Sequence, residues 1–102
     1  MNPPTQTNQG NKPYVEDVVF IPVEIRALTI NEVIKTGLTI ARDMLGTIDE
    51  YCLYEVGGEV VIEYWRDEEL SVKLIYANDP ARALMRFYDA ERSGLVKCSS
   101  VS

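Results

Sequence analysis

Two acidic clusters carry the side chains in this sequence that are best suited to binding a metal ion. Asp67-Glu68-Glu69 places three carboxylates in a row, and Asp49-Glu50 places two. Carboxylate oxygens are the ligands that hard divalent cations such as Mg²⁺ and Ca²⁺ prefer. Consecutive acidic residues beside a predicted hairpin are, however, typical of solvated turns. We therefore expect no metal site at either cluster.

Few other residues in the sequence are suited to catalysis. The chain contains no histidine, which is the side chain that most often serves as a general base or a metal ligand. We find no glycine-rich phosphate loop, no nucleophile elbow and no cysteines at metal-binding spacing. The sequence therefore predicts that the protein is not an enzyme, has no catalytic residues and needs no cofactor.

Two cysteines, Cys52 and Cys98, are the remaining reactive side chains. Cys52 lies in a strand pattern, which predicts a small core residue. Cys98 lies in a serine-rich stretch near the C-terminus. A disulfide between them stays open as an alternative, although disulfides are less common inside cells.

Charge and hydropathy narrow the classes of partner. The 102 residues include 10 basic and 16 acidic side chains, for a net charge of −6, whereas non-specific nucleic-acid binding depends on basic residues that neutralise phosphates. The run of arginines Arg82, Arg86 and Arg92 is interrupted by Asp89 and Glu91, which predicts a solvated, charge-paired helix face. No apolar run approaches the roughly 20 residues needed to span a bilayer, and the N-terminus lacks signal-peptide features. We expect an acidic intracellular protein with no nucleic-acid and no membrane partner.

The N-terminal quarter predicts an arm followed by a strand. Residues 1–13 are rich in proline, asparagine and glutamine and contain no apolar residue after Met1, so we expect a disordered arm. The β-branched and aromatic run Val18–Ile25 predicts a strand. Because Pro22 cannot donate a ladder hydrogen bond, this strand belongs at an edge or a bulge.

A helix follows with a clear start and stop. Thr29 and Glu32 have the spacing of a capping box, in which each side chain bonds a backbone N–H of the other. Apolar residues then recur at intervals of three and four, which predicts a helix over Ile30–Leu45, and Gly46 supplies the stop. Gly37 lies on the apolar side of this helix, where it either lets another element approach closely or is a tolerated weakness.

The second half changes to a period of two. Tyr51–Val56 and Glu59–Trp65, joined by Gly57-Gly58, predict a tight hairpin. Leu70–Tyr76 predicts a further strand.

A second helix and a tail complete the predicted fold. Asp79 and Pro80 are a favourable N-cap and first helical residue, and this helix ends near Gly94. We predict a single α+β domain over residues 14–94, in which a mainly antiparallel four-stranded sheet carries two helices, followed by a C-terminal tail over residues 95–102. Each half ends in a strand that leads to a capped helix, which suggests two similar strand-helix motifs.

Pairing within the predicted sheet assigns its two faces. If Val56 pairs with Glu59, and Trp65 with Leu70, one face is a core, and the other is too apolar to face water alone. A helix, a second copy of the chain or another protein could each cover it. Since interfaces favour aromatic residues, we predict that four residues of this face bind a partner: Tyr51, Leu53, Ile62 and Tyr64. The predicted edge strand Val18–Ile25 is the other candidate: either a partner's strand extends the sheet there, or Pro22 protects this edge.

One stretch resembles a known interaction module. The segment from Thr29 through Val56, with the run Asp49-Glu50-Tyr51-Cys52-Leu53-Tyr54-Glu55-Val56 after its helix, resembles the middle of a Ras-association domain of ubiquitin-like fold. This resemblance implies binding of a small GTPase. That family uses basic residues on its second strand, whereas Val18–Ile25 offers only Glu24 as a charge.

A second resemblance concerns the chain as a whole. Its length, its run from Met1 to Ser102, and the repeated strand-to-helix motif ending at Gly46 and Gly94 resemble the small orphan proteins of filamentous viruses of hyperthermophilic archaea, of the Acidianus filamentous virus 1 type. That resemblance implies no activity and no site residues. It implies an accessory viral protein of the host cytoplasm. The sequence thus predicts a non-enzymatic protein that binds a protein or peptide partner, with a homodimer left open and small-GTPase binding as the alternative.

Overall fold

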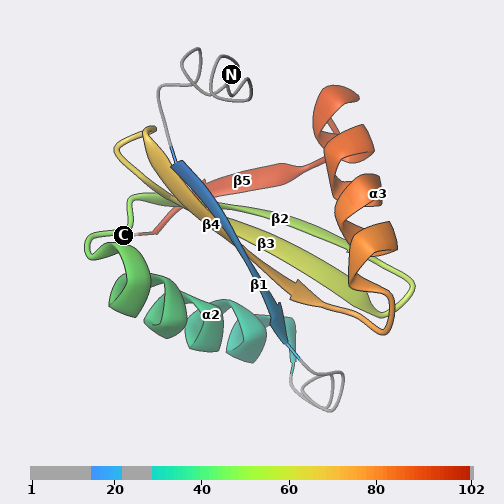
Figure 1. Ribbon diagram of the computed structural model, residues 1–102, viewed down its shortest axis with the longest axis horizontal. Coiled ribbons are helices and arrows are strands. Elements are labelled where there is room, and N and C mark those ends of the chain that lie inside the picture. The colour runs from blue at the N-terminus through green and yellow to red at the C-terminus, as the bar shows by residue number, and fades with distance from the viewer. Residues whose placement is uncertain (1–14, 22–28, 102) are drawn as a thin grey trace, which may run out of the picture.

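The computed structural model describes residues 15–21 and 29–101, and the predicted arm over residues 1–13 lies outside them. The described elements are β1 (Val15–Ile21), α2 (Ile30–Leu45), β2 (Glu50–Val56), β3 (Glu59–Arg66), β4 (Leu70–Tyr76), α3 (Pro80–Arg92) and β5 (Lys97–Ser100) (Figure 1). The five strands form one sheet in the order β1-β4-β3-β2-β5. The predicted α+β class is confirmed.

The sheet differs from the predicted four-stranded antiparallel one in two respects. Strand β5 adds a fifth strand, antiparallel to β2, within the stretch predicted as a tail. Strand β1 pairs in parallel with β4, whereas the other neighbouring pairs are antiparallel. The four side chains of β5 are all exposed, so this strand has no hydropathic alternation from which it could be predicted.

Both helices begin at their predicted caps. The backbone N–H of Glu32 donates to Thr29 Oγ1 over 3.2 Å, and the N–H of Thr29 donates to Glu32 Oε1 over 2.8 Å, which completes the capping box. The carboxylate of Asp79 accepts from the N–H of Arg82 at the start of α3, with Pro80 as the first helical residue. The predicted bounds of α2 are confirmed.

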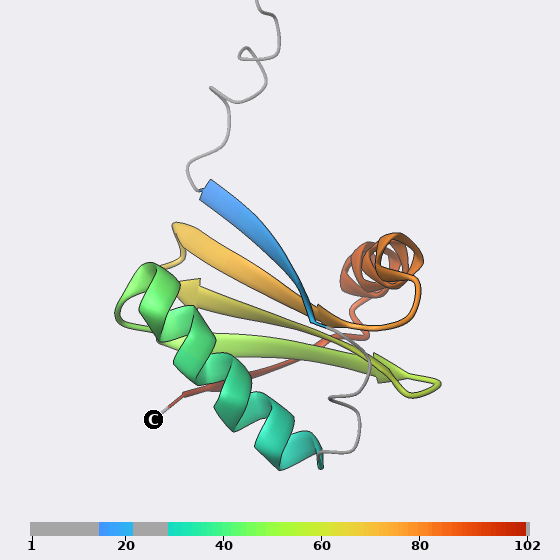
Figure 2. The same ribbon diagram turned by 60° about the horizontal axis from the view of Figure 1, so that its bottom comes forward.

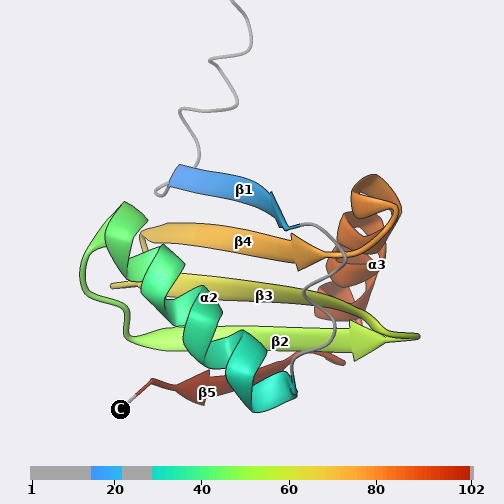
Figure 3. The same cartoon turned by 90° about the horizontal axis from the view of Figure 1, so that it is seen from below.

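The helices cover opposite faces of the sheet. Viewed from below, α2 crosses in front of the strands and α3 lies behind them (Figure 3), and the intermediate view separates the same three layers (Figure 2). The core on the α2 face consists of Val33, Ala41, Ile48, Val60, Ile62, Tyr64, Val72, Leu74 and Tyr76. The smaller core on the α3 face consists of Val61, Ile75, Ala77, Ala83 and Phe87. One helix on each face was among the arrangements that the sequence left open.

The predicted pairing is correct for β2 with β3 and wrong by one residue for β4. Tyr51 lies opposite Tyr64, as predicted, but Leu70 pairs with Arg66 instead of Trp65. The connecting turn is therefore shorter than the four-residue loop that the sequence suggested. It is tight because Asp67 and Glu68 adopt positive φ angles of 53° and 63°, which few residues other than glycine, asparagine and aspartate adopt.

A shift of one residue turns every side chain of a strand to the other face. Val72, Leu74 and Tyr76 consequently lie on the α2 face, together with the residues predicted to bind a partner. Lys73 comes to lie opposite Glu63 on the α3 face. The α3 face is thus the more polar of the two.

Candidate partner-binding surface

The four residues predicted to bind a partner all lie on the α2 face, which is not open. Ile62 and Tyr64 are 0% exposed beneath α2, so neither offers a partner accessible surface of its own. Tyr51 and Leu53 are half-buried at the margin of the same core. Of the predicted set, only these two present surface to a partner.

Gly37 allows α2 to lie this close to the sheet. Tyr64 Oη donates to the backbone carbonyl of Ile34 over 2.7 Å, and a Cβ at Gly37 would collide with the same hydroxyl. Burial, followed by the neighbouring Tyr76 and Tyr51 side chains, raises the pKa of Tyr64 well above its usual range. Of the two interpretations of Gly37, close approach is the one that the structure confirms.

A groove opens beside Tyr51, between α2 and the C-terminal end of β5. Its volume is about 340 Å³, and it is lined by Ile34, Lys35, Leu38, Tyr51, Tyr64, Ser100 and Val101. The rings of Tyr51 and Tyr64 lie side by side there, with their centroids 6.2 Å apart. Apart from Lys35 and Ser100, the lining is apolar or aromatic.

The groove joins residues that are far apart in the sequence. Ile34 and Leu38 follow the apolar period of α2, so their inward direction is predictable, but their position over Tyr51 is not. No sequence pattern indicates that Val101 lines a groove, because it lies in the predicted tail. Leu53 lies outside the groove, in a neighbouring hollow with Leu95 and Lys97.

Strand β5 forms the edge of the sheet next to this groove. It pairs with β2 alone, and the ladder continues past it, where the N–H of Val101 donates to the carbonyl of Asp49 over 2.9 Å. Among the described residues, no strand lies on its other side. An edge strand of this kind can be extended by the main chain of another segment.

The α3 face buries an ion pair. Lys73 Nζ lies 2.9 Å from Glu63 Oε2, and the two side chains are 0% and 2% exposed. The ammonium group also lies 5.5 Å from the centre of the Tyr88 ring. Glu63 Oε1 has no hydrogen-bond partner within the part of the chain that is described. Because both side chains are inaccessible to solvent, we assign this pair to the core and not to a binding site.

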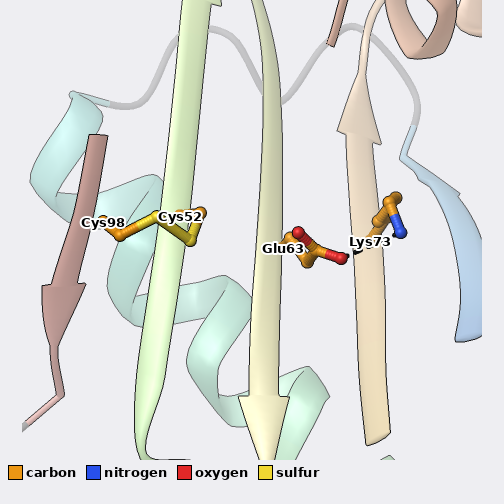
Figure 4. Close-up of a disulfide and its surroundings, with 4 residues drawn as sticks. All are labelled: Cys52, Glu63, Lys73 and Cys98. Atoms are coloured by element: carbon orange, nitrogen blue, oxygen red, sulfur yellow. Dashed lines mark ion pairs between the residues drawn. A yellow bond between two sulfur atoms is a disulfide. The ribbon is translucent and has the colours of Figure 1, made fainter. Parts of the chain in front are cut away.

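Cys52 and Cys98 form a disulfide between β2 and β5. The sequence leaves this disulfide open as the less favoured alternative, because disulfides are less common inside cells. Strand β5 puts Cys98 directly opposite Cys52. Cys52 is nevertheless buried, as predicted. The disulfide lies in one row across the α3 face with Glu63 and Lys73 (Figure 4).

The acidic cluster Asp67-Glu68-Glu69 lies in the turn between β3 and β4. The side chains of Asp67, Glu68 and Glu69 are exposed, and the N–H of Asp67 donates to Asp49 Oδ2 over 2.7 Å. Within the described ranges, the side chains that lie close enough together to hold a metal ion are those of Glu50, Cys52 and Cys98. None of the three turn residues belongs to this group.

Arg86 and Arg92, two of the arginines predicted on a charge-paired face of α3, form ion pairs, Arg86 with a strand and Arg92 within the helix. Arg86 forms an ion pair with Glu59 over 3.3 Å, and Arg92 pairs with Asp89 on the same helix.

Comparison with protein-family models, with curated proteins and with solved structures gives no match. Neither α2 nor α3, the helices of the described chain, combines the length and apolar character needed to cross a membrane.

Proposed function

We propose that the protein binds an extended segment of a partner protein at the β5 edge, with a side chain of that segment in the groove beneath α2. The observation that supports this proposal most directly is the position of the groove. It lies where the edge strand ends: Ser100 belongs to both the strand and the groove, and Val101, the next residue, lines the groove and bonds Asp49 of the neighbouring chain segment. The same segment could therefore pair with the edge and fill the groove.

Main-chain pairing would supply much of the binding energy. An added strand takes its hydrogen bonds from the exposed backbone groups of an edge, and alternate side chains provide the specificity. Side chains on one face of the added strand would point toward α2, as those of Tyr51 and Leu53 do on β2. The groove lining favours an apolar or aromatic residue at one of those positions.

Tyr51 is the residue through which we test the proposal. It lines the groove and is half-buried, and tyrosines in such positions often dominate the binding energy. Tyr54 is a matched control, because it is a half-buried tyrosine on the same strand that faces α3. Both can be changed to alanine without altering charge.

The experiment selects peptides from a displayed random library and measures their affinities by fluorescence anisotropy. We expect Tyr51→Ala to weaken the selected peptides by about tenfold or more, equivalent to the loss of roughly 1.4 kcal/mol, whereas Tyr54→Ala leaves them within about twofold. Amide hydrogen exchange of β5 should slow when the peptide is bound. Equal effects of the two substitutions, or unchanged exchange in β5, would contradict the proposal.

Light scattering over a concentration series separates a partner protein from a second copy of this chain. A dimer that Tyr51→Ala dissociates would mean that the edge pairs with itself. A chain that stays monomeric at every concentration would mean that the edge does not pair with itself, so its partner is a different protein. Small-GTPase binding stays a prediction from the sequence, because no contact described above bears on it.

A further inference from the structure

The carboxylate of Glu50 lies beside the disulfide between Cys52 and Cys98. An oxygen of Glu50 and the sulfurs of Cys52 and Cys98 all lie within 4.8 Å of one another. Glu50 precedes Cys52 by two residues on β2, so both side chains point to the same face of the sheet. Cys98 comes from the neighbouring strand, directly opposite Cys52.

Strand pairing, and not the disulfide alone, places these three groups together. On one side of Cys98, Val96 packs against the α3-face core. On the other side, Val101 packs against the α2-face core, and its N–H bonds Asp49. Because β5 is fixed at both ends, we expect the two sulfurs to stay opposite each other after the bond between them is broken.

We propose that Cys52, Cys98 and Glu50 form a redox-gated site for a thiophilic divalent cation, of which Zn²⁺ is the best fit. Two thiolates and one carboxylate are ligands that Zn²⁺ accepts, with Zn–S distances of about 2.3 Å and tetrahedral geometry. This set leaves the fourth position to water or to an external ligand. The disulfide form has no thiolate to offer and binds no cation.

Reduction opens the site through ordinary thiol–disulfide exchange. A thiolate of a dithiol reductant attacks the sulfur of Cys98, which is the exposed cysteine, and the bond to Cys52 breaks with Cys52 leaving as a thiolate. The second thiol of the reductant then displaces Cys98, so the reductant ends as a cyclic disulfide and the protein gains two electrons. When the cation binds, any proton on either thiol is released to solvent.

Cobalt(II) is the probe, because thiolate-bound Co²⁺ has an intense charge-transfer absorption that Zn²⁺ lacks. The full chain is reduced with dithiothreitol, desalted without oxygen and titrated with Co²⁺, and Zn²⁺ is then added as the competitor. We expect one Co²⁺ per reduced chain, displacement of Co²⁺ by Zn²⁺, and no absorption from the oxidised chain.

Three variants identify the ligands. Cys98→Ser should abolish the absorption of a two-thiolate site. Glu50→Gln should weaken Co²⁺ binding by about tenfold or more, since removal of even an outer-shell partner costs about 10- to 100-fold in metal affinity. Glu55→Gln is the matched control and should change nothing, because Glu55 lies on the same strand, is exposed and faces the other side of the sheet.

Two outcomes would overturn the proposal. One is a folded, reduced chain that shows no thiolate–cobalt absorption, and the other is equal affinity of Glu50→Gln and Glu55→Gln for Co²⁺. Circular dichroism, recorded in parallel, covers the case in which reduction unfolds the chain. Refolding by stoichiometric Co²⁺ would then support the site, and a chain that stays unfolded with Co²⁺ would exclude it.

Discussion

The two faces of the sheet achieve the same degree of burial with different chemistry. Beneath α2 the sheet presents apolar side chains and Tyr64, whose hydroxyl bonds the helix backbone beside Gly37. Beneath α3 it presents Lys73 and Glu63, both essentially unexposed. The polar face is therefore as dry at its centre as the apolar one.

This difference shows that the composition of a face does not decide whether it is covered. The apolar face lies under a helix, and its openings are at the margin, where Tyr51 meets the groove. The charged residues of the polar face can be buried because Lys73 and Glu63 neutralise each other. Their pairing removes much of the free-energy penalty for burying either charge alone. Binding is accordingly sought at edges of the sheet and not on its faces.

The difference between the two faces can be tested most directly at the buried ion pair of Lys73 and Glu63. We expect Lys73→Met to destabilise the fold by about 3–5 kcal/mol, because it leaves the Glu63 carboxylate buried without a counter-charge. The double variant Lys73→Met with Glu63→Leu should recover much of this loss, since an apolar pair of similar volume requires no counter-charge. Chemical denaturation measures both changes.

The Arg86–Glu59 pair is the control for this experiment. Its side chains are 39% and 22% exposed, so Arg86→Met should cost no more than about 1 kcal/mol. If Lys73→Met costs no more than Arg86→Met, water reaches the Glu63 carboxylate, and the two faces do not differ as described.

The contact beneath α2 should tolerate change less well than helix propensity suggests. Alanine normally favours a helix over glycine by about 1 kcal/mol, but a methyl group at Gly37 collides with the Tyr64 hydroxyl. We expect Gly37→Ala to destabilise the fold by about 1–3 kcal/mol, which is typical of overpacking. Thermal melting would show the loss, and added Tyr64→Phe should recover part of it. Additive effects of the two substitutions would mean that the side chains do not meet.

The elements with strong local signals were predicted well. The bounds of α2 and β4 agree with the sequence, because a capping box, a period of 3.6 and flanking polar turns each depend on nearby residues. The register of β4 could not be obtained in this way. It depends on a turn in which Asp67 and Glu68 adopt positive φ angles, and the sequence contains no glycine there to indicate them.

The candidate site was predictable only in part. Tyr51 was chosen because it is an aromatic residue on an apolar face, and it does line the groove. Ile62 and Tyr64 belong to the same predicted apolar face, yet they lie beneath α2, because the sequence does not show which face a helix covers. The disulfide and the groove both depend on β5, whose exposed side chains bury too little to leave a pattern.

Alkaline pH provides the mildest test of the difference between the faces. Burial raises the pKa of both Tyr64 and Tyr76, which lie on the α2 face. In the unfolded chain these tyrosines lose their protons near pH 10, as free tyrosine does, while the folded chain still retains them. Because the folded state then binds more protons, stability is complete below about pH 10 and falls as the pH rises further.

Tyr64→Phe isolates the contribution of one of these hydroxyls. At neutral pH the variant should lose about 1 kcal/mol with the hydrogen bond to Ile34, and above pH 10 its stability should fall less steeply than that of the parent chain. Tyr54→Phe is the matched loss of one phenol from the α3 face. Denaturation curves recorded at intervals from pH 8 to pH 11 measure the slopes. If Tyr64→Phe keeps the parent slope, the hydroxyl is reached by water, and the close packing beneath α2 does not seal the apolar face.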